Sequence, residues 1–418
     1  MRGTRCLLFS AMMALLIFGG MPDDPARAQN TIRIGGTMAL TGPGATYGVG
    51  VMRSATIAVD EINAKGGING KKVEFICLDS EHQPVKTIAN ARKLVEKEKV
   101  VAMLGCSNSA SNIALAPIIN NELKVPVIVI TDAMEIIENE AAQKGLPNYM
   151  FRFQMYGTGQ TKAMFTFARE KFGYKNIALF TWTGGWGVTG RTGLRQRLKE
   201  ANIQAVADET YDAADTDMTP QILKIRAAKA DVILNYGIVR ENVYALRAKD
   251  KLGDKTPIIT THALASLSFW EAAEGLAEGV MCTTWVTVDG PRTDKLNKFL
   301  AEYNRRYGPN LESVTGTLAA YDEIYLLAQV IAKAGPNPKA IRDGLENIPS
   351  YGGLTREFKR PVFTKDRHEA FIWDQDFFLC RWTAGKLLKV NFDGKGPYVN
   401  IPPSGQKRYI NKKTAELE

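Results

Sequence analysis

Short apolar runs alternate with amphipathic segments along the first third of the chain. The run TIRIGGTMAL at 31–40 has the length and composition of a buried strand. The next segment has the spacing of a helix that buries one face, with apolar residues at Val51, Ala55, Ala58 and Ile62. The alternation continues to residue 131. It predicts a βαβαβ series, and therefore a parallel sheet covered by helices on both faces.

A second series of the same kind begins near residue 176 and ends near residue 261. The runs NIALFTW, DVILNYG and TPIITT predict strands, and the charged segments between them predict helices. Two long helices are predicted at 292–308 and 313–335. A hairpin with AGK at its turn is predicted within 369–392.

These two series predict an α/β fold with two doubly wound parallel-sheet lobes joined by hinge crossings. No linker rich in Pro, Ser or Gly separates the series, which indicates several chain crossings between the lobes. Ligands bind beyond the carboxyl ends of parallel strands, so two facing sheets predict a cleft. The predicted division is a signal peptide at 1–28, lobe 1 at 29–154, lobe 2 at 155–281, lobe 1 again at 282–360, and the completion of lobe 2 with a C-terminal tail at 361–418.

The N-terminus has the three parts of a secretory signal peptide. A basic stretch, MRGTR, precedes an uncharged apolar run of 16 residues, and Ala26 and Ala28 form a small-x-small cleavage pattern. The apolar run is short for a transmembrane anchor, which is the alternative. We therefore expect cleavage after Ala28 and a periplasmic location.

Charge and cysteine content narrow the possible partners. The formal net charge is +9, but Lys and Arg alternate with Glu and Asp, as in ARKLVEKEKV. This alternation is typical of solvated helix faces, so we expect no nucleic-acid partner.

Four cysteines follow the predicted cleavage point, and no CxxC spacing occurs, which excludes zinc and thioredoxin motifs. Their spacing does not assign disulfides, and buried free thiols are an equal alternative for Cys77, Cys106, Cys282 and Cys380.

The Gly-rich loop after the first strand does not complete a nucleotide-binding motif. Gly42 and Gly44 begin a GxGxxG pattern, but Tyr47 stands where the third glycine is required. HExxH, GxSxG and Walker motifs are absent, and the sequence has only three histidines. We therefore expect no catalytic residues, no metal and no cofactor, and a binding protein rather than an enzyme.

Polar residues follow the predicted strands where a ligand would bind. In GCSNSASN, the side chains of Ser107, Asn108 and Ser109 precede a helix, whose N-terminus suits a carboxylate. Simple N-capping of the helix is the alternative. Thr131 and Asp132 open the next such loop, and could contact a ligand or cap a helix.

The corresponding loop of the second series is TWTGGWGVTG at 181–190. Trp182 and Trp186 stand beside glycines there rather than in a helical stripe. Aromatic side chains in a loop at the mouth of a cleft favour a binding role.

The stretch IRIGGTMALTGPGATYGVGVMRSATIAVDEINAKGGINGKK resembles the start of the Leu/Ile/Val-binding proteins. These are the extracytoplasmic receptors of branched-chain amino acid ABC transporters, with a type I periplasmic binding protein fold. The resemblance continues through VPVIVIT and AAYDEIYLLA and covers roughly residues 31–335. It implies a monomer that closes its lobes over a small carboxylate and delivers it to membrane permease and ATPase subunits. A soluble sensing domain that signals to a receptor or kinase partner is the alternative.

The resemblance also implies ligand contacts at particular positions. Tyr47 matches an aromatic in the first loop, and Ser107 matches the serine that holds the ligand carboxylate, with Ser109 as the alternative register. The remaining matches are Thr131, Asp132 and Ala133, which share one assignment, and Trp186, Tyr236 and Tyr321.

One position departs from the family pattern. His262 stands where the amino acid binders have the acid that holds the ligand ammonium. A neutral imidazole does not replace a carboxylate as a counter-ion, and an unpaired buried ammonium is costly. Either Asp132 or Glu241 supplies the charge, or the solute is an apolar or aromatic acid without ammonium. His262 could also cap a loop and point away.

Overall fold

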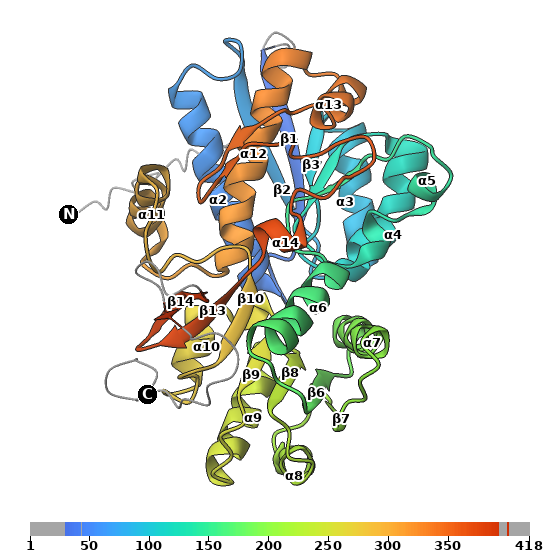
Figure 1. Cartoon of the computed structure of the whole chain (residues 1–418). Helices are drawn as coiled ribbons and strands as arrows, with labels where there is room; N and C mark the ends of the chain where they lie inside the picture. Colours follow the sequence, from blue (N-terminus) through green and yellow to red (C-terminus); the bar gives the residue numbers. More distant parts are fainter. Residues whose placement is uncertain (1–29, 43, 393–398, 401–418) are drawn as a thin grey trace, which may run out of the picture.

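The structure, a computed structural model, describes residues 30–42, 44–392 and 399–400 (Figure 1). The predicted signal peptide and its cleavage point after Ala28 lie outside the described residues. Two α/β lobes lie one above the other, each built on its own main sheet (Figure 1). The predicted fold class is therefore confirmed.

The first lobe contains a five-stranded sheet in the order β2-β1-β3-β4-β5, and every neighbouring pair is parallel. Met103, Val127 and Val129 face one side with the helices α3 and α4, whereas Leu104 and Ile128 face the side of α2 and α12. Strand side chains alternate between faces, and in β3 and β4 both faces are buried, so these two strands carry no polar residue. The strands are β1 (Thr31–Met38), β2 (Lys72–Asp79), β3 (Ala102–Leu104), β4 (Val127–Val129) and β5 (Met150–Arg152).

Helices from two separate parts of the chain cover this sheet. Three of them connect its strands, and three return from the far end of the chain, so that α12 packs along α2 (Figure 1). They are α2 (Ala45–Ala64), α3 (Pro84–Glu96), α4 (Ser109–Ile118), α11 (Asp294–Tyr307), α12 (Val314–Ala334) and α13 (Pro338–Leu345).

The second lobe contains an eight-stranded sheet in the order β15-β14-β13-β10-β9-β8-β6-β7. The pairs that join β10, β13 and β14 are antiparallel and the rest are parallel. The strands are β6 (Ile177–Trp182), β7 (Ala207–Tyr211), β8 (Val232–Tyr236), β9 (Ile258–Thr260), β10 (Met281–Thr284), β13 (Phe378–Thr383), β14 (Lys386–Asn391) and β15 (Val399–Asn400).

The helices of the second lobe include α7 (Gly185–Glu200), α8 (Thr219–Ala227), α9 (Val239–Lys251) and α10 (Leu267–Ala272). The predicted hairpin is present as β13 and β14. Its turn places both Ala384 and Gly385 at positive φ, 48° and 80°. Two consecutive left-handed residues match the right-handed twist of the flanking strands.

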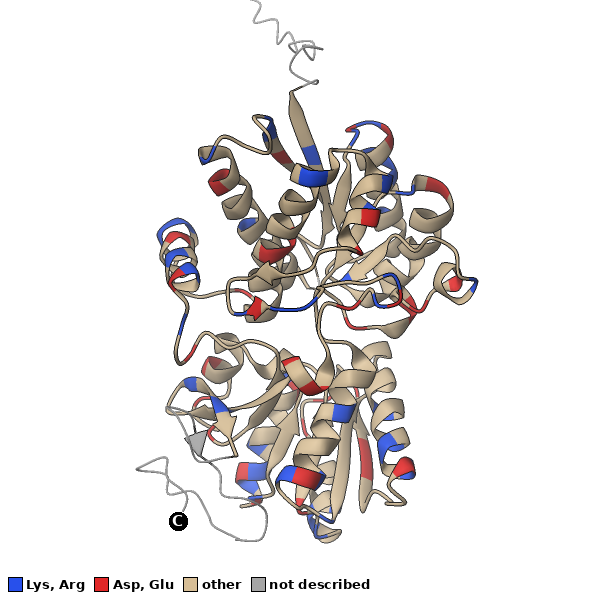
Figure 2. Ribbon diagram, turned by 45° about the horizontal axis from the view of Figure 1, so that its top comes forward, with Lys and Arg blue, Asp and Glu red and all other residues tan. Residues whose placement is uncertain are grey.

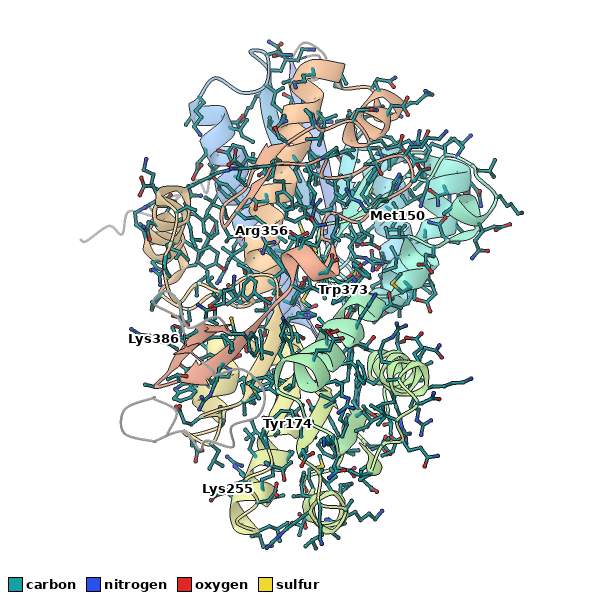
Figure 3. The ribbon with its side chains drawn as sticks, viewed as in Figure 1. Met150, Tyr174, Lys255, Arg356, Trp373 and Lys386 are labelled. Carbon is teal, nitrogen blue, oxygen red and sulfur yellow. The ribbon has the colours of Figure 1, made fainter. Side chains whose placement is uncertain are left out.

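The chain passes from the first lobe to the second through α6 (Gly157–Thr166), which lies at the junction in Figure 1. Trp373, labelled in Figure 3, begins α14 (Trp373–Asp376), which packs on α6. Nζ of Lys162 on α6 lies 4.5 Å from the centroid of the Trp373 ring. Val362 and Phe371 pack in the core of the first lobe, so its packing extends beyond residue 360. The remaining short elements are η1 (Ile119–Leu123), η2 (Met134–Ile136), α5 (Glu140–Gln143), η3 (Phe167–Lys171), η4 (His262–Leu264), β11 (Tyr351–Gly352) and β12 (Glu357–Phe358).

Lys and Arg interleave with Asp and Glu over both lobes (Figure 2), as the alternating sequence pattern predicts. The four cysteines among the described residues carry free thiols, and Cys282 lies directly opposite Cys380 across β10 and β13. Among the residues that the structure describes, no helix has the length and apolarity needed to cross a membrane.

Candidate binding site between the lobes

The candidate residues follow the carboxyl ends of strands in both lobes. Tyr47 lies in the first turn of α2 after β1, and the pair Thr131 and Asp132 follows β4. In the second lobe, Tyr236 ends β8 and His262 begins η4 after β9. The carboxyl ends of parallel strands share one edge of a sheet, which brings these loops together within each lobe.

Asp132 links the two lobes. Its side chain belongs to the first lobe and is 7% exposed. Its Oδ2 accepts a hydrogen bond from Nε1 of Trp186 and another from Oη of Tyr236 at 3.3 Å. The Trp186 and Tyr236 rings are 4.7 Å apart at 57°. A first-lobe carboxylate thus lies against two second-lobe aromatic side chains.

Gln160 on α6 connects Tyr236 to His262. Its Nε2 donates to Oη of Tyr236 at 2.7 Å. Its Oε1 lies 2.8 Å from Nδ1 of His262 and accepts the main-chain N–H of the same residue at 3.4 Å. Gln160 was not predicted as a site residue, because no strand or helix was predicted around it and a lone buried glutamine carries no sequence signal.

Burial sets the protonation of this cluster. It raises the pKa of Tyr236 well above its usual value, and the charge of Asp132 adds to the effect. Burial lowers the pKa of His262, and the attraction of Asp132 opposes this only in part. Tyr236 is therefore a phenol and His262 a neutral imidazole at neutral pH.

The Asp132 loop is held from behind by Arg152, which is fully buried. The guanidinium donates to the carbonyl of Asp132 at 3.2 Å and to the carbonyl of Ala133. Oγ1 of Thr131 accepts from Nδ2 of Asn112 at 2.9 Å. The main chain of Ala133 and the hydroxyl of Thr131 therefore stabilise the loop. Of Thr131, Asp132 and Ala133, Asp132 is the one whose side chain contacts the other lobe.

The three candidate residues in the loop after β3, Ser107, Asn108 and Ser109, have different roles. Asn108 caps α4, because its Oδ1 accepts from the N–H of Ser111 at 2.8 Å. Oγ of Ser107 accepts from the N–H of Ala39 at 3.1 Å. Ser109, the first residue of α4, is half-buried, and its hydroxyl has no hydrogen bond to the described residues. This leaves Ser109 the best placed of the three to meet a ligand carboxylate.

Tyr47 is engaged within the first lobe. Its hydroxyl donates to the carbonyl of Ile130 and accepts from Nε2 of Gln154, both at 3.0 Å. Its ring lies so close to Gly316 that a Cβ there would approach the ring to 2.6 Å. Tyr47 therefore packs between α12 and the strand that leads to Thr131 and Asp132.

Two predicted residues lie apart from this cluster. Tyr321 donates to Glu61 at 2.6 Å and packs on Phe299 at 5.1 Å, among the helices of the first lobe. Glu241 on α9 is 1% exposed and pairs with Arg240 at 2.8 Å. Of the two acids considered as the counter-ion, Asp132 is the one beside His262.

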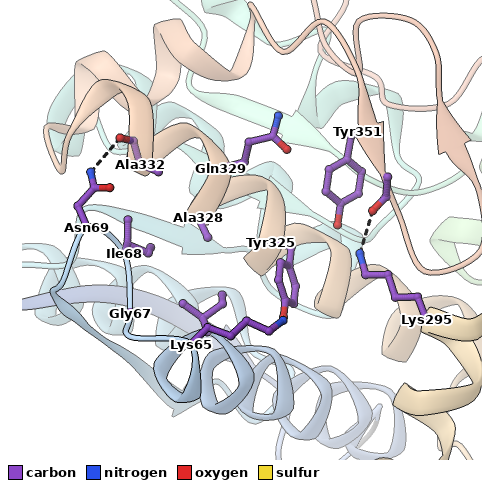
Figure 4. Close-up of a pocket in the computed structure, with 12 residues that line it drawn as sticks. Lys65, Gly67, Ile68, Asn69, Lys295, Tyr325, Ala328, Gln329, Ala332 and Tyr351 are labelled. Atoms are coloured by element: carbon purple, nitrogen blue, oxygen red, sulfur yellow. Dashed lines mark hydrogen bonds between the residues drawn. The ribbon is translucent and has the colours of Figure 1, made fainter.

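A separate groove of about 410 Å³ lies near Tyr321 on the first lobe (Figure 4). Lys65, Lys295, Tyr325 and Tyr351 line it, and Nζ of Lys295 donates to the carbonyl of Gly352 at 2.8 Å. These residues come from the C-terminal end of α2 and from α11, α12 and β11, so the groove shares no residue with the Asp132 cluster.

Two lobes with mainly parallel sheets, and an aromatic and acidic cluster between them, define a two-lobed solute-binding protein of type I architecture. The family model "Periplasmic binding protein" matches residues 31–386. The chain belongs to this periplasmic binding protein family, whose members bind substrates and are not enzymes. The resemblance to the Leu/Ile/Val-binding proteins is also confirmed.

Two relatives agree with this assignment, and two solved structures share the fold. The Leu/Ile/Val-binding protein BraC3 of Rhizobium johnstonii is 25% identical over 86% of this chain and 94% of its own length. The Leu/Ile/Val-binding protein homolog 7 of Brucella suis is 25% identical over 92% of this chain and 96% of its own. A periplasmic binding protein type 1 from Bordetella pertussis superimposes with a TM-score of 0.73 at 25% identity, covering 86% of this chain and 99% of that one. The branched-chain amino acid transporter substrate binding protein LivJ from Streptococcus pneumoniae, in complex with isoleucine, has a TM-score of 0.72 at 24% identity, covering 85% and 97%.

Proposed function

We propose that this protein is the extracytoplasmic solute receptor of an ABC importer of the branched-chain amino acid type. It is exported by its signal peptide, cleaved after Ala28, and captures a small carboxylate in the periplasm as a monomer. Membrane permease and ATPase subunits are its partners. The observation that carries the proposal is the contact of Asp132 with Trp186 and Tyr236, which joins the lobes where the strands of both sheets end.

The first lobe suits the carboxylate end of the solute. Ser109 offers a free hydroxyl at the N-terminus of α4, where main-chain N–H groups and the helix dipole favour an anion. Charge-assisted hydrogen bonds of this kind are stronger than those between neutral groups. We therefore place the carboxylate at Ser109, with the main chain near Ser107 beside it.

The second lobe suits the body of the solute. The half-buried ring of Trp186 presents aromatic surface next to His262, and the fully buried ring of Tyr236 packs behind it at 4.7 Å. An aliphatic side chain or an aromatic ring packs well against such surfaces. The solute is thus an amino acid or an apolar or aromatic organic acid, with Asp132 as the counter-ion when it is an amino acid.

Capture proceeds by hinge closure. Asp132 and Trp186 belong to different lobes, so their hydrogen bond exists only when the lobes approach each other. A solute that binds one lobe first and then contacts the other stabilises the closed form by its extra contacts. The permease then recognises the closed form.

Titration calorimetry of the mature protein with leucine, its keto acid and benzoate tests this proposal. We expect at least one of them to bind and to reduce the radius of gyration measured by small-angle scattering. Absence of binding by every small carboxylate would overturn the proposal. Uptake of the bound solute by cells that carry or lack this chain separates an import receptor from a soluble sensor, because only a receptor is required for uptake.

A further inference from the structure

A series of hydrogen bonds runs from Trp186 to His262 through the side chains of Asp132, Tyr236 and Gln160. Donor chemistry determines the direction of each bond in this series. The indole N–H of Trp186 can only donate, and an ionised Asp132 carboxylate can only accept. Oη of Tyr236 lies 3.3 Å from the same carboxylate oxygen, so its single proton points to Asp132. The Tyr236 oxygen is then free to act as an acceptor on its other side.

The orientation of the Gln160 amide determines which nitrogen of His262 carries the proton. Because Tyr236 has used its proton, the contact of 2.7 Å with Gln160 needs the amide Nε2 as donor. The amide oxygen Oε1 then faces His262, where it accepts the main-chain N–H. An amide oxygen has no proton to give, so Nδ1 of His262, at 2.8 Å, must carry the proton.

This order leaves one ring nitrogen as an acceptor. A neutral imidazole has a single N–H, and burial favours the neutral ring of His262. Nε2 is on the other side of the ring from Gln160. Within the part of the chain that the structure describes, no group hydrogen-bonds to Nε2, and the side chain is only half-buried. It is therefore free to accept a hydrogen bond from a solute.

We propose that Gln160 determines solute specificity by holding His262 in the Nδ1–H tautomer, so that Nε2 accepts a hydrogen bond from a donor group of the solute. This inference rests on the proposed receptor function and deepens it. The donor is a hydroxyl or an ammonium at the end of the solute that lies between Asp132 and His262. Gln160 itself acts through the ring and is a positioning residue.

The same geometry excludes other groups at this end. A ketone or a second carboxylate offers only acceptors, which would face the lone pair of Nε2 and the charge of Asp132. A site whose polar groups are left unpaired discriminates by about tenfold or more against the analogue that lacks the donor. The expected solutes are amino acids or hydroxy acids, and the disfavoured ones are keto acids and unsubstituted acids.

The first experiment reads the tautomer without any solute. Long-range nitrogen-15 NMR distinguishes Nδ1–H from Nε2–H rings, and the protein has only three histidines, so the signal lost in His262→Gln assigns the ring. We expect the Nδ1–H form in the native protein and a mixture of tautomers in Gln160→Met. Gln221→Met, on α8, is the matched control and leaves the spectrum unchanged. An Nε2–H ring, or an imidazolium at pH 7.5, would overturn the inference.

A second variant keeps the test open if Gln160→Met fails to fold. In Gln160→Glu the carboxylate accepts from Nδ1 of His262 and its charge favours the doubly protonated ring. Nε2 then becomes a donor, and the preference shifts from solutes with donors to the keto acid. A Gln160→Glu protein that keeps the native preference would contradict the proposed role of Gln160.

The solute arms use four compounds that differ at one carbon: leucine, 2-hydroxy-4-methylpentanoate, 4-methyl-2-oxopentanoate and 4-methylpentanoate. A second pair is 4-hydroxybenzoate and benzoate. In each set we expect the compounds that carry a donor to bind at least about tenfold more tightly than those without one. Comparison of leucine with the hydroxy acid separates the ammonium from the hydroxyl. Equal affinity for the keto acid would overturn the inference. An Nδ1–H ring with no binding by any compound would support the role of Gln160 and count against the receptor function.

Discussion

The two lobes bring their candidate residues to the site in different states. In the first lobe, the polar atoms of Tyr47, Asn108 and Thr131 are already bonded to their own lobe. In the second lobe, Trp186 and Tyr236 direct their polar atoms toward Asp132 of the first. This difference indicates that the hydrogen bonds of these first-lobe residues form without the second lobe, whereas those of the second-lobe cluster are completed only by closure.

The largest effect should follow from removing the charge that joins the lobes. Asp132→Asn keeps the shape of the side chain but removes its charge. Of the two predicted counter-ions, Asp132 and Glu241, only Asp132 lies beside His262. We expect amino acid affinity in calorimetry to fall roughly 100-fold or more, because a buried cation loses its counter-ion. Asp366→Asn, an exposed acid, is the control. Unchanged affinity in Asp132→Asn would show that solute binding between the lobes does not depend on the Asp132 charge.

A smaller effect should follow from removing one donor of the second lobe. Trp186→Phe retains an aromatic ring but lacks the indole N–H that bonds to Asp132. We expect about a tenfold loss of affinity, since a hydrogen bond to a charged group is lost. Trp270→Phe, whose ring packs on Trp382 at 5.4 Å, should leave affinity unchanged. The contrast between these variants would disappear if closure did not use the Trp186 N–H.

Removal of the Asn108 cap in the first lobe should lower the stability of the protein and leave its affinity for solute unchanged. Asn108→Ala removes the cap of α4 and should lower the free energy of unfolding by about 1 kcal/mol, measured by urea denaturation. Asn108→Asp keeps a capping oxygen and should restore the stability. A loss of affinity in Asn108→Ala at full stability would instead make Asn108 a ligand contact.

The smallest expected effect is a pH dependence of the first lobe. Burial raises the pKa of Glu369 to about 7, although Arg152 lies 3.5 Å away. The folded chain therefore binds more protons than the unfolded chain between the ordinary pKa of a glutamate and about 7, and stability falls as pH rises through this window.

Melting temperatures measured from pH 5 to pH 8 test this dependence. The native protein should melt a few degrees lower at the upper end, whereas Glu369→Gln should lose part of the decline, because its side chain stays neutral. A decline of the same size in both proteins would place its cause at other buried acids, such as Asp322, whose pKa burial raises to about 6.

Most strands and helices of the two series were predictable, because each buries an apolar stripe of regular spacing. The predicted strand at 31–40 is β1, and the helix at 313–335 is α12. β5 (Met150–Arg152) and α6 were not predicted. β5 has three residues, too few for a periodic pattern, and the buried residues of α6 include Gly157, Gln160 and Thr161, so this helix has no regular apolar stripe to reveal it.

The site was predictable by loop but not by side chain. The resemblance located the loops that carry Asp132, Trp186, Tyr236 and His262, and the structure brings these four together. It could not show that Asn108 serves as a cap, or that Tyr321 turns toward Glu61. A side chain at the end of a strand has several rotamers, and packing selects among them.

The sequence by itself determined the alternation of strands and helices, the edge of each sheet where the candidate site lies, and the family. These depend on local periodicity and on the rule that loops at the carboxyl ends of parallel strands gather at one edge. Only the tertiary structure decided that Asp132 lies beside His262 and that Gln160 connects Tyr236 to that ring. These contacts join residues about 100 positions apart, and their geometry depends on how the two lobes meet.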